Sequence, residues 1–457
     1  MPPVRLIPFA ALALPITAAQ ARPAPAPAPI PASVASATAD WQDALVARAK
    51  ALGVTDVTTR PAPNGGFILD GKIAGDAFAL GIPSGWQGGA LLYAHGYSTP
   101  GTPVAVSDDP VAKGPGTGLL GEAYSQGFAV GHSAYAKAGL GVETGVTNTK
   151  RLRDLVEKLG GKRIYVMGDS MGGGIVVTLL EMYPRAFAGG LARCGVVDSW
   201  QDLLGRLIDM RLAYNVLTKD TPYALPGEQD VRKNAIAPEP PAGTPDAAAQ
   251  AYVWGQIGKV GAPPLALWAA AQKNPDGQEA KIVRAVTAIG GFDNDAAALA
   301  FPLVTATLGA EDMAATAGGW VYGNVGKIYA APGLTPEENA ALNRDIQRVE
   351  AAPAALAYLQ RWHTATGRIA TPLVTIHNRI DSLVPFAQED TLKAAVAKAG
   401  RGRYLVQYGV PPTRAPLPIG GIEGYTHCGF DKGQTLAAWT ALRGWVETGA
   451  KPSPELP

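Results

Sequence analysis

The sequence predicts an α/β protein: a mostly parallel central sheet flanked by helices, with an inserted helical cap. Apolar, β-branched runs alternate with amphipathic helical stretches over residues 39–197 and again over 368–457. This alternation is typical of a parallel sheet that helices cover on both faces. Between these parts, from about residue 198 to 367, the apolar residues follow a helical period and no core strand is predicted. We therefore expect a cap inserted between two strands of one sheet.

The first residues predict export. Arg5 precedes an apolar run over residues 6–18, and Ala19-Gln20-Ala21 fits the small-residue cleavage site of a secretory signal peptide over residues 1–21. The run is too short, and too interrupted by proline, to span a bilayer. The Pro/Ala-rich segment 22–38 is predicted to be a disordered spacer. We expect a secreted or periplasmic protein without stable membrane insertion.

Composition narrows the class of partner. The chain has 457 residues, 47% of them hydrophobic, and a net charge of +1. This length can bury a large core. The near-neutral charge lacks the basic excess of proteins that bind nucleic acid. We therefore expect a small-molecule substrate and no nucleic acid, and the sequence does not predict an oligomeric state.

The first part of the predicted sheet begins with a helix and a hairpin and then alternates strands and helices. The predicted strands are 66–69, 77–82, 89–94, 127–135, 164–167 and 188–197, and the predicted helices are 39–52, 119–126, a helix ending at 159, and 175–182.

The cap is predicted to be helical, and the second part of the sheet again alternates strands and helices. Helical periods in the cap occupy residues 203–217, 247–260, 264–272 and 352–365, with Pro-containing loops at 238–245 and 332–336. The sheet resumes with strands at 372–378 and 404–410, a helix at 386–398 between them and a last helix at 434–447.

One strand–turn–helix carries a candidate nucleophile. Gly168-Asp169-Ser170-Met171-Gly172 fits the pattern G-x-S-x-G between a predicted strand and a predicted helix. Glycines without a β-carbon let the strand and the helix crowd around an exposed Ser170 hydroxyl. The Met171 N–H, at the start of the helix, would point to where an oxyanion forms.

A serine nucleophile needs a base and a group that orients the base. Asp381 follows one late strand and His427 lies in the loop after the next, and the carboxyl ends of parallel strands meet at one edge of the sheet. Asp198, after the strand that follows the serine, is an alternative acid or a pocket residue. His95 and His132 are candidate pocket residues.

These motifs together resemble those of α/β-hydrolases. The matching residues are the turn around Ser170, the turn 379–385, the loop 425–427 and the pair His95-Gly96, and the resemblance covers about residues 65–446. It implies a Ser170–His427–Asp381 triad and an oxyanion hole made by the N–H groups of Met171 and Tyr97.

The chain has two cysteines, Cys194 and Cys428. Cys428 adjoins the candidate base, and a cysteine directly after the catalytic histidine is also found in tannases and feruloyl esterases, which the chain resembles weakly. Here Asp169, not cysteine, precedes the serine. The two cysteines either form a disulfide that fixes the His427 loop or remain separate buried thiols.

The resemblance implies a serine hydrolase, and the apolar, aromatic cap favours hydrophobic or aromatic carboxylic esters. The alternatives are an amidase or peptidase similar to the prolyl-oligopeptidase-like enzymes, and a non-catalytic binding protein on the same scaffold. No metal-ligand cluster or Walker loop occurs in the sequence, and the glycines of residues 139–145 do not fit a dinucleotide loop. We therefore expect no metal and no cofactor.

Overall fold

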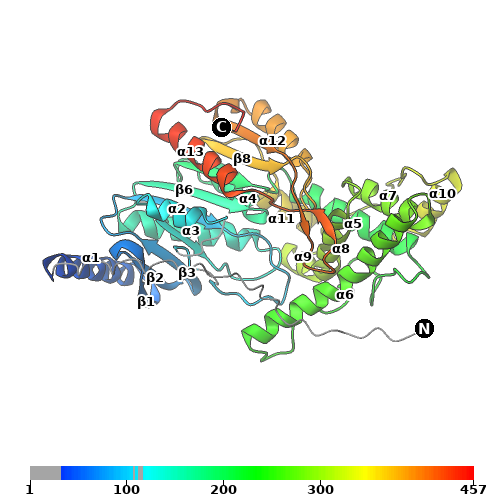
Figure 1. The fold of residues 1–457 in the computed structure, drawn as a ribbon, viewed down its shortest axis with the longest axis horizontal. Coiled ribbons are helices and arrows are strands. Elements are labelled where there is room, and N and C mark those ends of the chain that lie inside the picture. Colours follow the sequence, from blue (N-terminus) through cyan, green and yellow to red (C-terminus); the bar gives the residue numbers. More distant parts are fainter. Residues whose placement is uncertain (1–31, 107–108, 112–116, 457) are drawn as a thin grey trace, which may run out of the picture.

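The computed structural model describes residues 32–106, 109–111 and 117–456, and it contains one large sheet (Figure 1). The predicted signal peptide and most of the predicted spacer lie outside the described residues. The strands of the large sheet are β1 (Thr55–Pro61), β2 (Phe67–Ile73), β3 (Asp76–Ile82), β4 (Gly89–Ala94), β5 (Ala129–Ser133), β6 (Arg163–Asp169), β7 (Gly189–Arg193), β8 (Leu373–Asn378) and β9 (Leu405–Val410).

The order of these strands is β1-β2-β3-β5-β4-β6-β7-β8-β9. Pairing is antiparallel from β1 through β3 to β5 and parallel from β5 through β4 to β9. The crossing of β4 and β5 and the antiparallel β3 are those of the α/β-hydrolase fold. The predicted fold class is therefore confirmed.

Helices cover both faces of the sheet. Alternate strand residues point to opposite faces, so Leu92 and Val166 belong to one core and Leu91 and Tyr165 to the other. The first core is covered by α3 (Val142–Leu159), α4 (Met171–Met182) and α12 (Ala387–Lys398), and the second by α2 (Leu119–Ser125) and α13 (Lys432–Thr448). This packing fixes the carboxyl ends of the strands at one edge.

The chain between β7 and β8 is mainly helical and lies on the side toward which the β6 and β8 arrows point (Figure 1). The Ala365 N–H donates to the Asp198 carbonyl at 2.7 Å, so the chain leaves and rejoins the sheet at neighbouring points. The helices are α5 (Trp200–Leu217), α6 (Asp246–Lys273), α7 (Gln278–Gly290), α8 (Ala296–Leu308), α9 (Ala310–Ala317), α10 (Pro336–Asp345) and α11 (Pro353–His363).

Helices α6 and α1 (Ala32–Ala51) and strand β1 are among the elements that differ from the expectations. The two helices predicted at 247–260 and 264–272 are one helix, α6, which continues through Pro263 and Pro264. Each proline lacks the N–H of a helical hydrogen bond, but α6 packs along α7 and α8, which hold it in place. Helix α1 begins inside the predicted spacer, directly after its last proline, Pro31. Strand β1 was not predicted, because most of its residues are exposed and polar.

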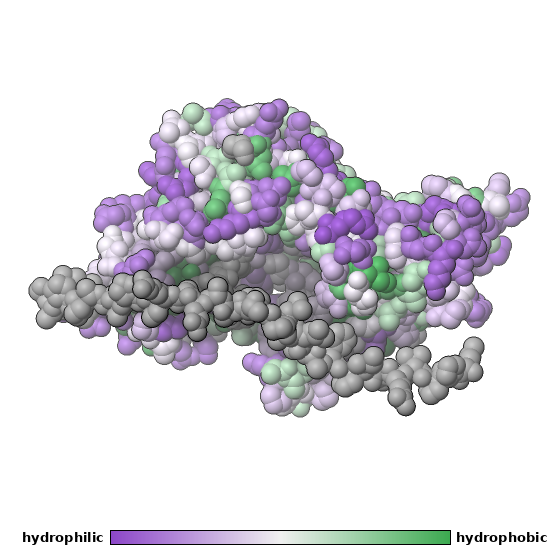
Figure 2. Space-filling model, viewed as in Figure 1, coloured by the Kyte–Doolittle hydropathy of each residue, from purple (hydrophilic) through white to green (hydrophobic). Residues whose placement is uncertain are grey.

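The face of the molecule drawn in Figure 2 is largely polar where the described residues are visible. Figure 2 shows hydrophilic residues over most of this face, including the end of the helical insertion that carries α7 and α10. In contrast, nearly every residue of α8 is buried. Within the described ranges, every helix is too short or too polar to cross a bilayer.

Candidate active site

Ser170 lies at a sharp turn between β6 and α4. Its backbone has φ 57° and ψ −119°, a conformation that costs a non-glycine residue about 1–3 kcal/mol. A β-carbon at Gly172 would collide with the Ala94 backbone, which explains the glycine there. The Ser170 N–H donates to the Arg193 carbonyl at 3.0 Å, so the neighbouring strand holds the turn. The Met171 N–H, in the first turn of α4, has no carbonyl partner within the helix.

A buried ion pair supports this turn. Arg193 of β7 is 2% exposed and donates to both Asp169 oxygens, from Nε at 2.6 Å and from Nη2 at 2.8 Å. The Tyr93 hydroxyl also donates to Asp169, at 3.2 Å. Burial opposes the charge of Arg193, yet Asp169 outweighs it and raises the pKa of the guanidinium. The sequence analysis missed this pair, because strand residues 24 positions apart leave no local pattern.

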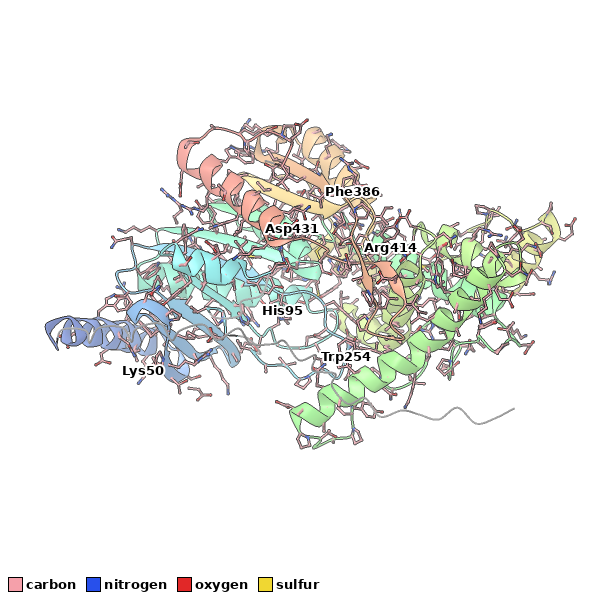
Figure 3. The ribbon with its side chains drawn as sticks, in the orientation of Figure 1. Lys50, His95, Trp254, Phe386, Arg414 and Asp431 are labelled. Carbon is pink, nitrogen blue, oxygen red and sulfur yellow. A yellow bond between two sulfur atoms is a disulfide. The ribbon has the colours of Figure 1, made fainter. Side chains whose placement is uncertain are left out.

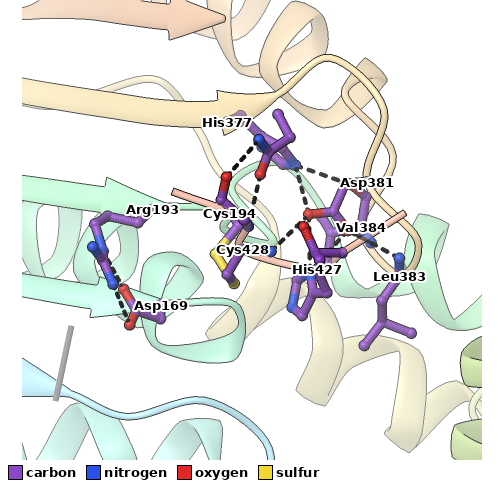
Figure 4. The surroundings of a disulfide bond; sticks show 12 residues. Asp169, Arg193, Cys194, His377, Asp381, Leu383, Val384, His427 and Cys428 are labelled. Atoms are coloured by element: carbon purple, nitrogen blue, oxygen red, sulfur yellow. Dashed lines mark hydrogen bonds and ion pairs between the residues drawn. A yellow bond between two sulfur atoms is a disulfide. The ribbon is translucent and has the colours of Figure 1, made fainter. Parts of the chain in front are cut away.

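His427 and Asp381 lie in contact. His427 Nδ1 is 2.8 Å from Asp381 Oδ1 and 2.9 Å from Oδ2 (Figure 4). The Leu383 and Val384 N–H groups each donate to Asp381 Oδ1 at 2.9 Å, which fixes the carboxylate in its turn. Burial raises the pKa of Asp381, but the charge and hydrogen bond of His427, the charge of His377 and the hydrogen bond from the Val384 N–H outweigh it and hold that pKa below its ordinary value. Of the two candidate acids, Asp381 is the one that meets the imidazole.

The other ring nitrogen of His427 is available. Nε2 is buried and makes no hydrogen bond to any residue that the structure describes, and no bond joins it to the Ser170 hydroxyl. Catalytic hydrogen bonds are often long in the absence of substrate. The Ser170 turn and the His427 loop are nevertheless tied to the same segment. The Ser170 N–H donates to the Arg193 carbonyl, and the next residue, Cys194, is bonded to Cys428, which follows His427.

A disulfide joins Cys194 to Cys428, with the two Cα atoms 5.2 Å apart (Figure 4). It ties the segment after β7 to the residue that follows His427. Cys194, His427 and Cys428 bring their ligand atoms within 4.8 Å of one another. Both sulfurs are used in the disulfide, so neither is the thiolate that a metal would need.

The His95 loop lies beside Ser170. A β-carbon at Gly96 would be 3.4 Å from that of Ser170, so the next residue, Tyr97, begins close to the serine. The His95 ring stacks on Tyr135 with centroids 3.7 Å apart, and burial lowers the pKa of His95, so the ring is neutral. Burial raises the pKa of the Tyr97 hydroxyl, which reaches the α8–α9 junction at Gly309.

A cavity of about 510 Å³ opens next to this loop. Its lining includes Tyr93, His95, Tyr97 and His132 on the sheet side and Gln250 on α6. Figure 3 labels His95 on the sheet side and Trp254, one turn further along α6 than Gln250. Two of the three predicted pocket residues, His95 and His132, therefore line one cavity.

Asp198, the third predicted pocket residue, does not line this cavity. Its N–H donates to the Gln388 side chain at 3.0 Å. Burial and the nearby charge of Asp202 raise the pKa of Asp198 to about 6.

A ribbon that the sequence analysis missed connects the His427 loop to the insertion. Strands β10 (Arg414–Pro416) and β11 (Glu423–Tyr425) pair in a small sheet against α8. Asp295, which caps α8, accepts from the Tyr425 N–H at 2.9 Å and faces Arg414 at 3.0 Å. The loop is therefore held by α8 on one side and by the disulfide on the other.

No protein-family model matches the chain, and no curated protein sequence matches it. Among solved structures, feruloyl esterase B from Aspergillus oryzae is 14% identical, with a TM-score of 0.42 over 89% of this chain and 91% of that chain. The rice cell wall degrading esterase LipA from Xanthomonas oryzae is 14% identical, with a TM-score of 0.38 over 81% and 87%. A brefeldin A esterase is 14% identical, with a TM-score of 0.34 over 82% and 76%.

The strand order, rather than these distant likenesses, identifies the architecture. The sharp turn at Ser170 follows β6, which lies near the middle of the sheet, and the loops that carry Asp381 and His427 follow β8 and β9. The chain therefore has the α/β-hydrolase fold, with a helical insertion between β7 and β8.

Proposed function

We propose that the protein is an exported serine hydrolase that cleaves carboxylic esters through an acyl-enzyme on Ser170. The observation that carries the proposal is the His427 ring, which is held by Asp381 at one nitrogen and has the other free. This is the state in which an imidazole can take a proton from a serine hydroxyl. The strained turn at Ser170, a half-buried residue at the N-terminus of α4, supports the same conclusion.

In the proposed reaction, Ser170 Oγ attacks the ester carbonyl while His427 Nε2 takes its proton. Asp381 holds the Nδ1 hydrogen of the imidazole and stabilises the imidazolium. The N–H groups of Met171 and Tyr97 bind the oxyanion, and each such donor is typically worth about 10²–10³ in rate. His427 then delivers the proton to the leaving alcohol, and water releases the acid in the reverse sequence.

The cavity beside Tyr97 indicates the kind of ester. Its volume of about 510 Å³ lies within the usual range for small-molecule sites. The rings of Tyr93, Tyr97, His95 and His132 favour a hydrophobic or aromatic group. The disulfide is consistent with an oxidising compartment, and it supports export together with the leader pattern of the sequence.

Two paired measurements test the proposal. A panel of p-nitrophenyl esters of rising chain length, aryl esters and the matching anilides should give turnover of esters, with aryl esters among the best, and Ser170→Ala should abolish it. Turnover of anilides above esters would favour the amidase alternative.

The second pair of variants tests the choice of acid. Asp381→Asn should lower kcat about 10⁴-fold, because the imidazole loses its orienting carboxylate. Asp198→Asn should change kcat less than about threefold, because the carboxylate in contact with His427 Nδ1 is that of Asp381. The reverse pattern would assign the acid to Asp198.

A further inference from the structure

A second imidazole–carboxylate pair lies directly behind Asp381. His377 of β8 and Glu389 of α12 are 0% and 2% exposed. His377 Nδ1 is 3.3 Å from Glu389 Oε1, and its Nε2 is 4.0 Å from Asp381 Oδ2. Four ionisable groups therefore follow one another from α12 to the loop after β11: Glu389, His377, Asp381 and His427. Figure 4 shows the last three of them.

The hydrogen bonds determine where the protons lie. His377 Nε2 is 2.9 Å from the Val384 carbonyl, which can only accept, so Nε2 carries a hydrogen. Glu389 Oε2 accepts from the Thr375 hydroxyl and the Gln407 amide, each at 2.6 Å. Two donors on one oxygen favour the ionised carboxylate. His377 Nδ1, which faces the other oxygen, then carries a hydrogen as well, and the ring is an imidazolium.

The charges that face His377 are few. Glu389 approaches from α12 and Asp381 from the turn after β8, while β9 pairs Gly409 with His377 and the ring of Phe386 lies edge-on 5.8 Å away. Burial lowers the pKa of His377, but the hydrogen bond to Glu389 and the charges of Asp381 and Glu389 outweigh it and raise that pKa. The sequence does not connect His377 with Glu389, because the two residues lie on different elements.

We propose that His377 and Glu389 are positioning residues that keep Asp381 ionised and in place and thereby set the pH range in which His427 is a free base. The inference rests on the proposed function of Asp381 and His427. Because His377 lies between Glu389 and Asp381, its positive charge is nearer to the Asp381–His427 pair than the negative charge of Glu389 is. That charge offsets part of the negative charge beside His427, so we expect its removal to make His427 hold its proton more tightly.

His377 also holds the turn that carries Asp381. The Val384 N–H donates to Asp381 Oδ1, and the Val384 carbonyl accepts from His377. A variant that removes the His377 ring would therefore change both charge and geometry. Glu389→Gln separates these effects, since the amide keeps the size of the side chain and its NH₂ can donate to Nδ1, which leaves His377 in place but neutral.

The test measures the titration of His427 directly. Protein labelled with ¹³C in the histidine rings is titrated by NMR as wild type, as Glu389→Gln and as Asp390→Asn, and a His427→Gln sample assigns the signal. Asp390 is the matched control, because it is an exposed carboxylate in the same helical turn. An opposite charge in contact shifts a pKa by about 1–3 units, so a charge that acts through Asp381 should shift His427 by about 0.5–1 unit.

We expect the titration midpoint of His427 to rise by that amount in Glu389→Gln and to stay within about 0.1 unit in Asp390→Asn. The midpoint of the acid limb in the pH profile of kcat/KM should rise by the same amount, while KM stays unchanged. Thr375→Val, which removes one donor to Glu389 Oε2, should shift the midpoint in the same direction by less. It provides the same test if Glu389→Gln does not fold.

Two results overturn the inference: an unchanged midpoint in Glu389→Gln, or equal shifts in Glu389→Gln and Asp390→Asn. Ester turnover is a separate readout. A shifted midpoint in a protein without ester turnover would retain the positioning pair and reject the proposed function. Ester turnover with an unshifted midpoint would support the proposed function and reject the positioning role of His377 and Glu389.

Discussion

Replacing Arg193 by methionine tests whether the buried ion pair supports the serine turn. The substitution keeps much of the aliphatic volume but removes both hydrogen bonds to Asp169 and leaves that carboxylate without a counter-ion. Removal of one partner from a buried pair typically costs about 3–5 kcal/mol. The Asp169 side chain is 15% exposed, so we expect the lower end, about 3 kcal/mol of unfolding free energy.

The double variant Asp169→Asn/Arg193→Met removes both charges. It should be more stable than the sum of the single changes predicts, because no buried charge remains unpaired. Urea unfolding followed by tryptophan fluorescence measures all variants, with the exposed pair Arg344–Asp345 as a control in which Arg344→Met should cost less than about 0.5 kcal/mol. A loss below about 1 kcal/mol for Arg193→Met, or strict additivity in the double variant, would refute the reasoning.

Three further variants test stability and the His427 loop. Asp198→Asn should stabilise the protein at pH 7–8 but not near pH 4. The pKa of Asp198 is raised to about 6, so the folded state binds this proton more tightly than the unfolded state and loses stability as pH rises from about 4 to 6. Equal effects of the substitution in thermal melts at both pH values would contradict this. Replacing both Cys194 and Cys428 by serine opens a loop of 234 residues and should cost about 3–5 kcal/mol, with a lower kcat, and an unchanged Tm would contradict it. Asp295→Ala removes the acceptor of the Tyr425 N–H and should speed hydrogen exchange at that amide at least about tenfold, whereas unchanged exchange would show that the ribbon holds the loop without α8.

The central strands could be predicted because both of their faces are buried. Strand β4 has the predicted bounds, Gly89–Ala94, and all but its first residue are buried. A continuous apolar run with glycine or proline nearby is a local signal. The serine turn is local as well, since Gly168 and Gly172 are required by close contacts within a few residues and with β4.

The remaining features depend on contacts between distant segments. Strand β1 is mostly exposed, so its pairing with β2 leaves no apolar pattern. Helix α6 continues through two prolines only because other helices pack beside it. The partners of Arg193, Asp295 and His377 come from other elements, and a charged residue alone does not reveal which opposite charge it will meet.

The central claim is that Ser170 is a nucleophile activated by His427. Incubation with a fluorophosphonate probe, followed by proteolysis and mass spectrometry, measures this most directly, because the probe reacts with activated serines. We expect one adduct, on Ser170, which is absent in Ser170→Ala and forms at least about 10³-fold more slowly in His427→Gln. An unlabelled but folded wild-type protein, or an adduct on another residue, would contradict it.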